Sequence, residues 1–307
     1  MLAPPEQIGK LELIENIEYW YGIDAGELEF QPSGEDSWNF RIGSLWWVSV
    51  RRDFRGHVPP AYAAARELAD SGIDFIIAPT RNRDSNCTSY LARSGLPLVV
   101  YPWSRAVPIG QVRSPYLASC LADLLAVVHR SSVEEVLPKE DFKLAAVESL
   151  YEHLTWADRV VNPANYSSDD DLHNLLSNHR AFLLRLLDDT VRIGAILRER
   201  APSLFLTHGD PSATNFLKED GKILLVDWGG ACLAPAERDW FHLRKNFGSA
   251  PLGDLLIEEF YRKSWILTEV DEYATCLRKK SVGEADASAM RNRMRRWLAA
   301  AVKEYDR

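Results

Sequence analysis

The spacing of apolar residues along the chain changes from a strand-like to a helix-like pattern. In the first third, short apolar runs alternate with turn residues, which predicts a small antiparallel sheet with one inserted helix. Gly43 and Ser44 lie between two of these runs and predict a two-residue hairpin loop. The predicted strands are 27–31, 38–42, 45–51, 74–78, 89–92 and 97–101, and the inserted helix is 59–70.

Most of the remaining chain has apolar residues at helical spacing. Two short apolar runs, 204–206 and 223–226, interrupt it and are predicted to pair as strands. The pattern therefore predicts an α/β chain, with a sheet first and mainly helices after it. The further predicted helices are 5–20, 114–130, 139–160, 170–200, 236–247, 251–263 and 285–303.

Composition places the chain among globular proteins. Its 307 residues favour two domains or one large two-lobed domain, and 46% hydrophobic with 26% charged residues excludes disordered, collagen-like and coiled-coil classes. The 44 acidic and 36 basic residues give a net charge of −8. This balance argues against a large nucleic-acid surface and is compatible with a cationic small-molecule partner.

The cysteines and the hydrophobic runs indicate where the chain resides. The four cysteines form no Cys-x-x-Cys pair, which favours reduced thiols over disulfides or zinc. The N-terminus lacks a basic region followed by an apolar run, and no stretch approaches 18 uninterrupted apolar residues. We therefore expect no signal peptide, no membrane span and a cytoplasmic location.

Polar side chains follow the two apolar runs of the second part. Asp210 and Asn215 come after the first run, five positions apart across a turn, and Asp227 ends the second. Each alone would be interpreted as a turn or cap residue, but the three together favour a site made only of oxygen ligands, which suits Mg²⁺. Magnesium beside a free carboxylate is what phosphoryl transfer to a hydroxyl requires.

These residues also carry a resemblance to a known family. His208-Gly209-Asp210-x4-Asn215 with Val226-Asp227-Trp228 resembles the catalytic and metal motifs of the aminoglycoside phosphotransferases, which have a protein-kinase-like fold. The segment 233–239 resembles the spectinomycin-type branch, and 46–52 and 98–103 are similar to its third strand and hinge. The resemblance spans residues 34–245.

The resemblance implies a two-lobed α/β (α+β) fold. Residues 1–100 would form a nucleotide-binding N-lobe with an antiparallel sheet, 101–103 the hinge, and 104–307 a mainly helical C-lobe for catalysis and substrate binding. It further implies that Asp210 is the catalytic base, and that Asn215 and Asp227 are the magnesium ligands, with His208 in support.

The resemblance also implies the residues of the nucleotide site. They are Ser37 and Asn39 in the hairpin turn 33–39, Ser49 and Arg51 in the third strand, and Val99, Tyr101 and Trp103 at the hinge.

One position departs from the family. Ser49 stands where the family has a phosphate-binding Lys. Arg51 lies on the same face of the strand and could replace the Lys, with Glu67 as its partner. The alternative is that Arg51 and Arg52 are solvated strand-end charges.

Two other residues are interpreted as structural. His129 ends an apolar helical run, and we expect it to pack against the helices rather than to bind a ligand. Arg238 stands between Glu237 and Asp239, which predicts an ion-pair corner linking the metal loop to the helices.

The function implied is ATP-dependent phosphorylation of a hydroxyl on a small, cationic molecule, with GTP as the other possible nucleotide. The first hypothesis for the acceptor is an aminoglycoside or aminocyclitol antibiotic, which phosphorylation would inactivate. The alternatives are a metabolic kinase for an amino-sugar, choline-like or nucleoside hydroxyl, and a non-catalytic nucleotide-binding protein, which Ser49 suggests. No nucleic-acid or membrane partner is expected.

Overall fold

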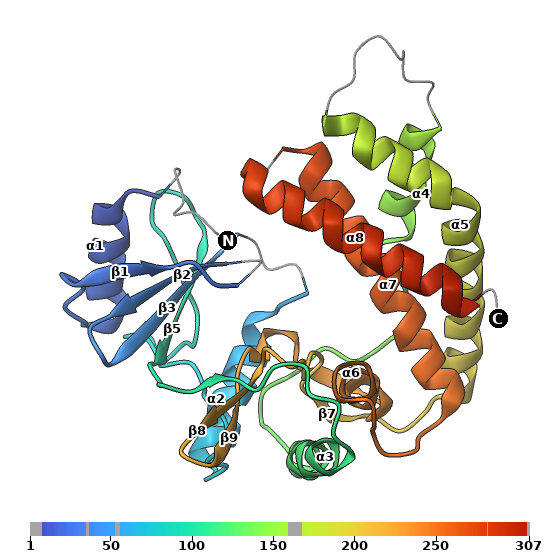
Figure 1. The fold of residues 1–307 in the computed structure, drawn as a ribbon. Helices are drawn as coiled ribbons and strands as arrows, with labels where there is room; N and C mark the ends of the chain where they lie inside the picture. Colours follow the sequence, from blue (N-terminus) through green and yellow to red (C-terminus); the bar gives the residue numbers. More distant parts are fainter. Residues whose placement is uncertain (1–7, 35–36, 53–55, 159–167, 281, 306–307) are drawn as a thin grey trace. The chain divides into compact units, whose positions relative to one another are not determined.

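The computed structural model describes residues 8–34, 37–52, 56–158, 168–280 and 282–305 (Figure 1). The chain forms two compact units, each built from two separate stretches. The first unit comprises Met1–Glu140 and Ser203–Gly253, and we call it the catalytic unit because it contains the predicted base Asp210. The second, the helical unit, comprises Asp141–Pro202 and Asp254–Arg307. The predicted lobes and hinge are a functional division of the chain, and they stay a prediction.

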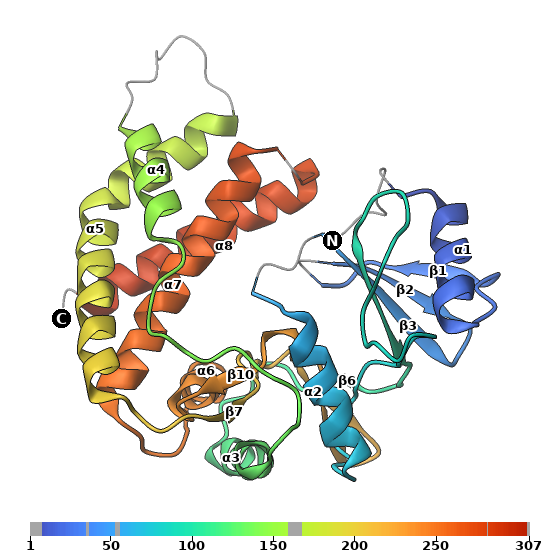
Figure 2. The ribbon, with the colours of Figure 1, turned by 180° about the vertical axis from the view of Figure 1, so that it is seen from behind.

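The catalytic unit contains a five-stranded antiparallel sheet in the order β1-β2-β3-β5-β4. Helix α1 (Lys10–Tyr21) lies along the sheet in both views (Figures 1 and 2), and its Tyr21 hydroxyl donates to the carbonyl oxygen of Leu98. The mixed helix and strand content confirms the predicted fold class. The strands are β1 (Leu28–Gln31), β2 (Ser37–Ile42), β3 (Trp46–Arg51), β4 (Ser89–Tyr90) and β5 (Pro97–Pro102).

Two local predictions for this sheet are wrong. Ile42 pairs with Trp46, so the hairpin loop has the three residues 43–45 instead of the predicted Gly43-Ser44 pair. Residues 74–78 were predicted to form a strand, but Ile76 makes only an isolated parallel bridge to Leu225. Residues such as Ile76 and Ala78 are buried here, and one bridge to Leu225 takes the place of a longer row of paired strand residues.

The predicted pairing of the runs 204–206 and 223–226 is also wrong. β7 (Phe205–Thr207) pairs with β10 (Cys232–Ala234), and β9 (Lys222–Leu225) pairs with β8 (Phe216–Glu219), both antiparallel. β8 also pairs with the short β6 (Val107–Pro108). The loops 208–215 and 226–231 leave the ends of β7 and β9, so they belong to two different sheets.

Three helices complete the catalytic unit: α2 (Pro59–Asp70), α3 (Pro115–Arg130) and α6 (Glu237–Phe247). Leu68 of α2, Leu125 of α3 and Leu243 of α6 meet in one buried core together with Phe216 and Trp228. The loop that carries Trp228 is thus anchored in the core of the unit by a large buried side chain.

The helical unit consists of α4 (Val147–Ala157), α5 (Ser168–Arg200), α7 (Leu255–Arg278) and α8 (Glu284–Tyr305), which share one apolar core. α4 begins later than predicted, and α7 extends fifteen residues beyond the predicted end at 263, to Arg278. In the described part of the chain, no helix is both long enough and apolar enough to cross a membrane. All four cysteines are free thiols, as expected.

Candidate active site

The loop after β7 carries the predicted base, Asp210. Its carboxylate is 53% exposed. Asn215 donates from its side-chain amide to Asp210 Oδ2 at 3.0 Å and to the Asp210 carbonyl oxygen at 2.9 Å. The other carboxylate oxygen, Oδ1, lies 3.0 Å from Nδ1 of His242 on α6. Side chains therefore hold both oxygens, while the carboxylate keeps an open side.

The neighbours of Asp210 keep it ionised. Burial by itself raises the pKa of the Asp210 carboxyl, but the hydrogen bond and charge of His242, with His208 and Lys245 nearby, lower that pKa well below its ordinary value. Asp210 is therefore a carboxylate at neutral pH, ready to accept a hydrogen bond from a hydroxyl group.

His208 joins the loop of Asp210 to the loop of Asp227. Its buried ring lies with Nε2 2.9 Å from the carbonyl oxygen of Val226, and Nδ1 accepts from the backbone N–H of Asp210 at 3.2 Å. The ring also makes an edge contact with Trp228. Burial lowers the pKa of His208 despite nearby carboxylates. A neutral ring that donates from Nε2 and accepts at Nδ1 satisfies both contacts.

Asp239 holds the loop of Asp210 in place, and the sequence reasoning named it only as a neighbour of Arg238. Its fully buried carboxylate accepts from the backbone N–H of His208 at 3.0 Å and of Gly209 at 2.8 Å. It also lies 2.8 Å from Nε2 of His129 on α3, which is buried and packs against Trp240 of α6, as predicted for its packing. Burial alone raises the pKa of Asp239, but His129 and these N–H groups lower it below its ordinary value. The carboxylate therefore fixes the start of the Asp210 loop.

The side chain of Arg238 lies between β7 and the loop that carries Asp227. Its guanidinium donates to the Thr207 hydroxyl at 3.1 Å and to the carbonyl oxygen of Gly230 at 3.0 Å. A Cβ on Gly209 would lie 2.4 Å from Arg238 Nη1, so only glycine leaves room for the guanidinium. Arg238 thus links the loop of Asp227 to β7 through these hydrogen bonds.

The loop that carries Asp227, which we call the metal loop after its predicted role, begins directly after β9 and lies beside the loop that carries Asp210. The backbone N–H of Val226 donates to the carbonyl oxygen of Asn215 at 3.0 Å. Asp227 follows with φ 65° and ψ 59°, a left-handed conformation that is unfavourable for a residue other than glycine. Such strain is found at functional sites, where the surroundings hold the residue in place. The structure brings Asp210, Asn215 and Asp227 onto adjoining loops.

The predicted nucleotide residues share one face of the sheet. Asn39 pairs with Ser49, and Ser49 pairs with Val99, across three adjacent strands. Because side chains alternate along a strand, Arg51 and Tyr101 project to that face as well. Ser37 lies opposite Arg51 and joins the same face. Ser37, Asn39, Ser49 and Arg51 are all buried.

Two other parts of the predicted nucleotide site have definite contacts. In the turn 33–39, of which residues 35 and 36 lie outside the described part, the Asn39 amide donates to the carbonyl oxygen of Ser33 at 2.8 Å. At the hinge, the backbone N–H of Trp103 donates to the carbonyl oxygen of Leu45 at 2.8 Å. The guanidinium of Arg41 lies 5.7 Å from the centre of the Trp103 ring. The Trp103 backbone N–H is therefore already used within the sheet.

Arg51 lies beside two residues that the sequence reasoning missed. It donates a side-chain hydrogen bond to Tyr62 on α2. The Tyr62 hydroxyl lies 2.9 Å from Nδ1 of His57, and that nitrogen lies 3.9 Å from Asp227 Oδ1. Tyr62 and His57 carry no motif, so only the fold could reveal them. The carboxylate of Glu67 accepts from the backbone N–H of Glu134 at 2.7 Å, and its pairing with Arg51 stays a prediction.

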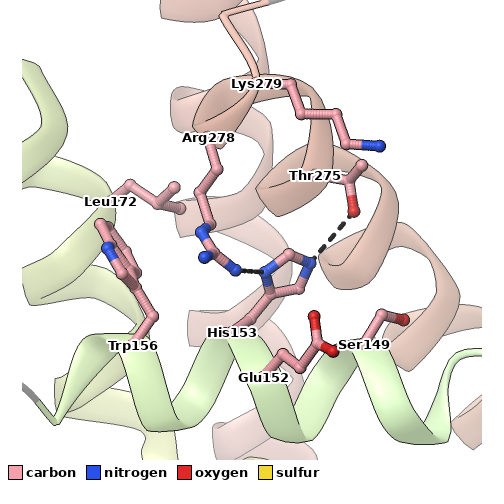
Figure 3. Close-up of a pocket in the computed structure, with 8 residues that line it drawn as sticks. All are labelled: Ser149, Glu152, His153, Trp156, Leu172, Thr275, Arg278 and Lys279. Carbon is pink, nitrogen blue, oxygen red and sulfur yellow. Dashed lines mark hydrogen bonds between the residues drawn. The ribbon is translucent and has the colours of Figure 1, made fainter.

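The helical unit contains a polar pocket of about 440 Å³ between α4 and the C-terminal end of α7 (Figure 3). Its size is in the range of small-molecule sites. Hydroxyl, carboxylate, ammonium and indole groups face it together. The lining residues are Ser149, Glu152, His153, Trp156, Leu172, Thr275, Arg278 and Lys279.

Hydrogen bonds fix the floor of this pocket. Buried His153 receives a hydrogen bond at Nδ1 from Arg278 at 2.6 Å, and its Nε2 lies 3.1 Å from the Thr275 hydroxyl (Figure 3). Nε2 is also 3.3 Å from Asp271 Oδ1. The Arg278 guanidinium lies 5.1 Å from the centre of the Trp156 ring. Polar side chains that contact one another therefore line the pocket, which suits a polar ligand.

Comparison with known proteins gives a consistent result. A model of the phosphotransferase enzyme family matches residues 50–274, which is more than half of the chain. Protein StrN of Streptomyces griseus is 35% identical over 285 residues, which cover 88% of this chain and 86% of StrN.

Solved structures share the fold. Spectinomycin phosphotransferase APH(9)-Ia, in complex with ADP and spectinomycin, has a TM-score of 0.72 at 19% identity, covering 95% of this chain and 94% of that one. An ethanolamine kinase of Plasmodium vivax has a TM-score of 0.54 at 12% identity, covering 97% of this chain and 96% of that one. These likenesses confirm the predicted kinase-like fold.

Proposed function

The chain belongs to the phosphotransferase enzyme family, and on that premise we propose that it transfers the γ-phosphoryl group of ATP to a hydroxyl group of a small molecule. The observation that carries this proposal is the contact between Asp210 and Asn215 on one loop. His208 connects this loop to Val226, the residue that precedes Asp227. A base and two oxygen ligands on adjoining loops are the groups that phosphoryl transfer needs.

Asp210 is the proposed base. Its half-exposed carboxylate can accept a hydrogen bond from the acceptor hydroxyl, and its low pKa makes it a weak base that orients the hydroxyl first. As the new O–P bond forms, the bond from the γ-phosphorus to the β-phosphate oxygen breaks. The hydroxyl proton passes to Asp210, and ADP leaves. A weak base suits a loose transition state, in which the hydroxyl loses its proton late.

Asn215 and Asp227 are the proposed magnesium ligands. The Asn215 amide nitrogen donates to Asp210, which leaves the amide oxygen to face a cation. When bound, Mg²⁺ neutralises phosphate charge. The described residues contain no cluster of three or more His, Cys, Asp or Glu side chains able to hold a metal. Two protein ligands fit Mg²⁺, which takes its other ligands from water and substrate phosphates.

Arg51 is the proposed phosphate-binding cation in place of the family's Lys. It is buried on the sheet face that carries Ser49, and both Arg51 and Asp227 act electrostatically on Tyr62. Because Arg51 is buried on this face, its location supports phosphate binding over the alternative that Arg51 is a solvated charge at the end of the strand. A guanidinium can bind phosphate through two hydrogen bonds at once.

An aminoglycoside or aminocyclitol is the proposed acceptor class. Spectinomycin, which is bound to one protein of the same fold, supports this class, and the polar pocket of the helical unit supports a hydroxylated acceptor. Ser149 and Thr275 offer hydroxyl groups there, and exposed Glu152 offers a carboxylate for an ammonium group.

A screen of nucleotide consumption tests the proposal. The protein would be incubated with ATP or GTP, magnesium and single members of three acceptor classes: aminoglycosides and aminocyclitols, ethanolamine- and choline-like alcohols, and nucleosides. We expect acceptor-dependent release of ADP within the first class, and a loss of at least about a hundredfold in Asp210→Asn, which keeps the size of the side chain.

Other outcomes of the screen separate the alternatives. Turnover only with a metabolic alcohol would replace the antibiotic acceptor with a metabolic one. Nucleotide binding without turnover on any acceptor would point to the non-catalytic alternative. Full activity in Asp210→Asn would contradict the assignment of the base.

A further inference from the structure

The metal loop packs tightly against the start of α2. The backbone N–H of Val58 donates to the carbonyl oxygen of Gly229 at 2.9 Å. A Cβ placed on Gly229 would lie 1.8 Å from His57 Nδ1 and 2.6 Å from the Tyr62 hydroxyl. Only glycine permits this approach. The position of the loop that carries Asp227 is therefore set by His57 and Tyr62.

Tyr62 also faces the sheet. It is 1% exposed and packs against Val99, with Tyr101 at the edge of the same cluster. Burial raises the pKa of Tyr62 well above its ordinary value, although the charge of Arg51 opposes the shift. The hydroxyl therefore keeps its proton. It can accept the hydrogen bond of Arg51 on one side and give its own proton to His57 Nδ1 on the other.

These contacts form one continuous path. It runs from Arg51 on β3 to Tyr62 on α2, from Tyr62 to His57 at 2.9 Å, and from both rings to the Asp227 loop through their close approach to Gly229. His57 Nδ1 lies 3.9 Å from Asp227 Oδ1, which is too far for a hydrogen bond, so this last link is a packing contact. Arg51 and Asp227 are the two groups assigned above to the phosphates and to the metal. Both must meet the same nucleotide, and Tyr62 lies between them.

We propose that Tyr62 is a positioning residue, which holds Arg51 and the Asp227 loop, through His57, in the arrangement that binds a nucleotide triphosphate with its magnesium. This inference rests on the proposed function, because it assigns the phosphates to Arg51. The neutral Tyr62 hydroxyl can hold both Arg51 and His57 because it accepts from the cation and donates to the imidazole.

A double-mutant cycle tests the inference on the full chain. Isothermal titration would measure the dissociation constant of a non-hydrolysable ATP analogue with magnesium in wild type, Arg51→Ala, Tyr62→Phe and the double variant. Tyr62→Phe keeps the ring and its packing and removes only the hydroxyl. We expect it to weaken binding about five- to tenfold, which corresponds to the loss of about one ordinary hydrogen bond, because Arg51 itself stays in place. The double variant should bind about as weakly as Arg51→Ala alone, because coupled residues are not additive.

Tyr21→Phe is the matched control. Tyr21 is partly buried, donates from its hydroxyl to the carbonyl oxygen of Leu98 and accepts from the Ser89 hydroxyl at 2.9 Å. Removing the Tyr21 hydroxyl deletes a comparable pair of hydrogen bonds in the same unit, but on α1 instead of α2. We expect a similar change in melting temperature in both variants, and weaker nucleotide binding only in Tyr62→Phe.

The outcomes separate this inference from the proposed function. If wild type binds no nucleotide, the proposed function and the inference fail together. If Arg51→Ala weakens binding but Tyr62→Phe matches wild type, or the two losses are fully additive, the positioning role is wrong and the proposed function stands. Should Tyr62→Phe fail to fold, His57→Ala takes its place in the cycle with the same expectations.

Discussion

Nδ1 of His242 lies 3.0 Å from Oδ1 of Asp210, on the carboxylate oxygen that Asn215 does not contact. The base is thus held from two directions, by its own loop and by α6. His242 is buried, and its helix also carries Asp239, which binds the backbone of the same loop. α6 therefore positions both the backbone and the side chain of the proposed catalytic loop.

Replacing His242 should lower turnover more than nucleotide binding. His242→Phe removes the contact with Asp210 Oδ1 and should reduce kcat about tenfold or more, because the carboxylate loses the group that orients it. His242→Asn offers a donor at nearly the same place and should lose less. Steady-state kinetics with the acceptor found in the screen would give kcat and the KM for ATP. A rise in KM for ATP with unchanged kcat would contradict the role of His242.

Removing either proposed ligand should weaken magnesium-dependent nucleotide binding. Asn215→Ala and Asp227→Ala each delete an oxygen donor from a site with few protein ligands. Isothermal titration of a non-hydrolysable ATP analogue, with and without magnesium, would show a smaller gain from magnesium in both variants. Asp188→Asn, an exposed carboxylate on α5, is the control. An unchanged magnesium effect in both ligand variants would refute the assignment.

Arg51 should carry much of the nucleotide affinity. A charge-assisted hydrogen bond contributes about 1.5–3 kcal/mol, so Arg51→Ala should raise the KM for ATP roughly ten- to a hundredfold. Ser49→Lys restores a cation on the same face and should be tolerated, with partial rescue of Arg51→Ala. The KM values of the two single variants and the double would check this. If Arg51→Ala keeps the wild-type KM, the third strand contributes no phosphate-binding cation.

Asp239 should make the protein sensitive to acid. Its pKa in the folded state lies below the ordinary value of 3.8, so the folded state binds fewer protons than the unfolded one. The stability it contributes is present above pH 3.8 and is lost as the pH falls through the folded-state pKa. Asp239→Asn should destabilise the protein by about 3 kcal/mol at pH 7, since it breaks a buried pair with His129.

Urea unfolding of wild type and Asp239→Asn between pH 7 and pH 3 would measure this effect. The gap between their midpoints should begin to shrink below pH 3.8, where the unfolded wild-type chain takes up a proton on Asp239 that the folded protein resists. Asp188→Asn again serves as the exposed control. A gap that stays constant across the range would show that the charge of Asp239 does not stabilise the fold.

Local patterns predicted the elements better than their partners. The helices α2, α3 and α6 and the strands β1 to β3 follow their predicted ranges closely, because apolar residues and flanking turn residues mark them in the sequence. The pairing of β7 and β9 could not be predicted in this way. Their actual partners, β10 and β8, have only three and four residues, and tertiary packing decides which short strands meet.

In the candidate site, too, residues with a local sequence signal were predicted and residues that depend on the fold were not. Asp210, Asn215 and Asp227 stand out because polar residues directly follow apolar strands. Tyr62, His57 and His242 give no such signal, since each reaches the site from a distant helix or loop. The extension of α7 to Arg278 was missed as well, because residues of this helix are buried around much of its circumference and leave a weak periodic pattern.

The route of the chain between the two units has a consequence for engineering. The chain passes from one unit to the other after Glu140, Pro202 and Gly253, so neither unit is a single stretch of sequence. A protein cut short after residue 253 would keep the whole catalytic unit but only half of the helical one. Shortening from either end therefore cannot isolate an intact helical unit. A circular permutation that joins residues 254–307 to residues 141–202 by a linker would be needed to produce it as one polypeptide.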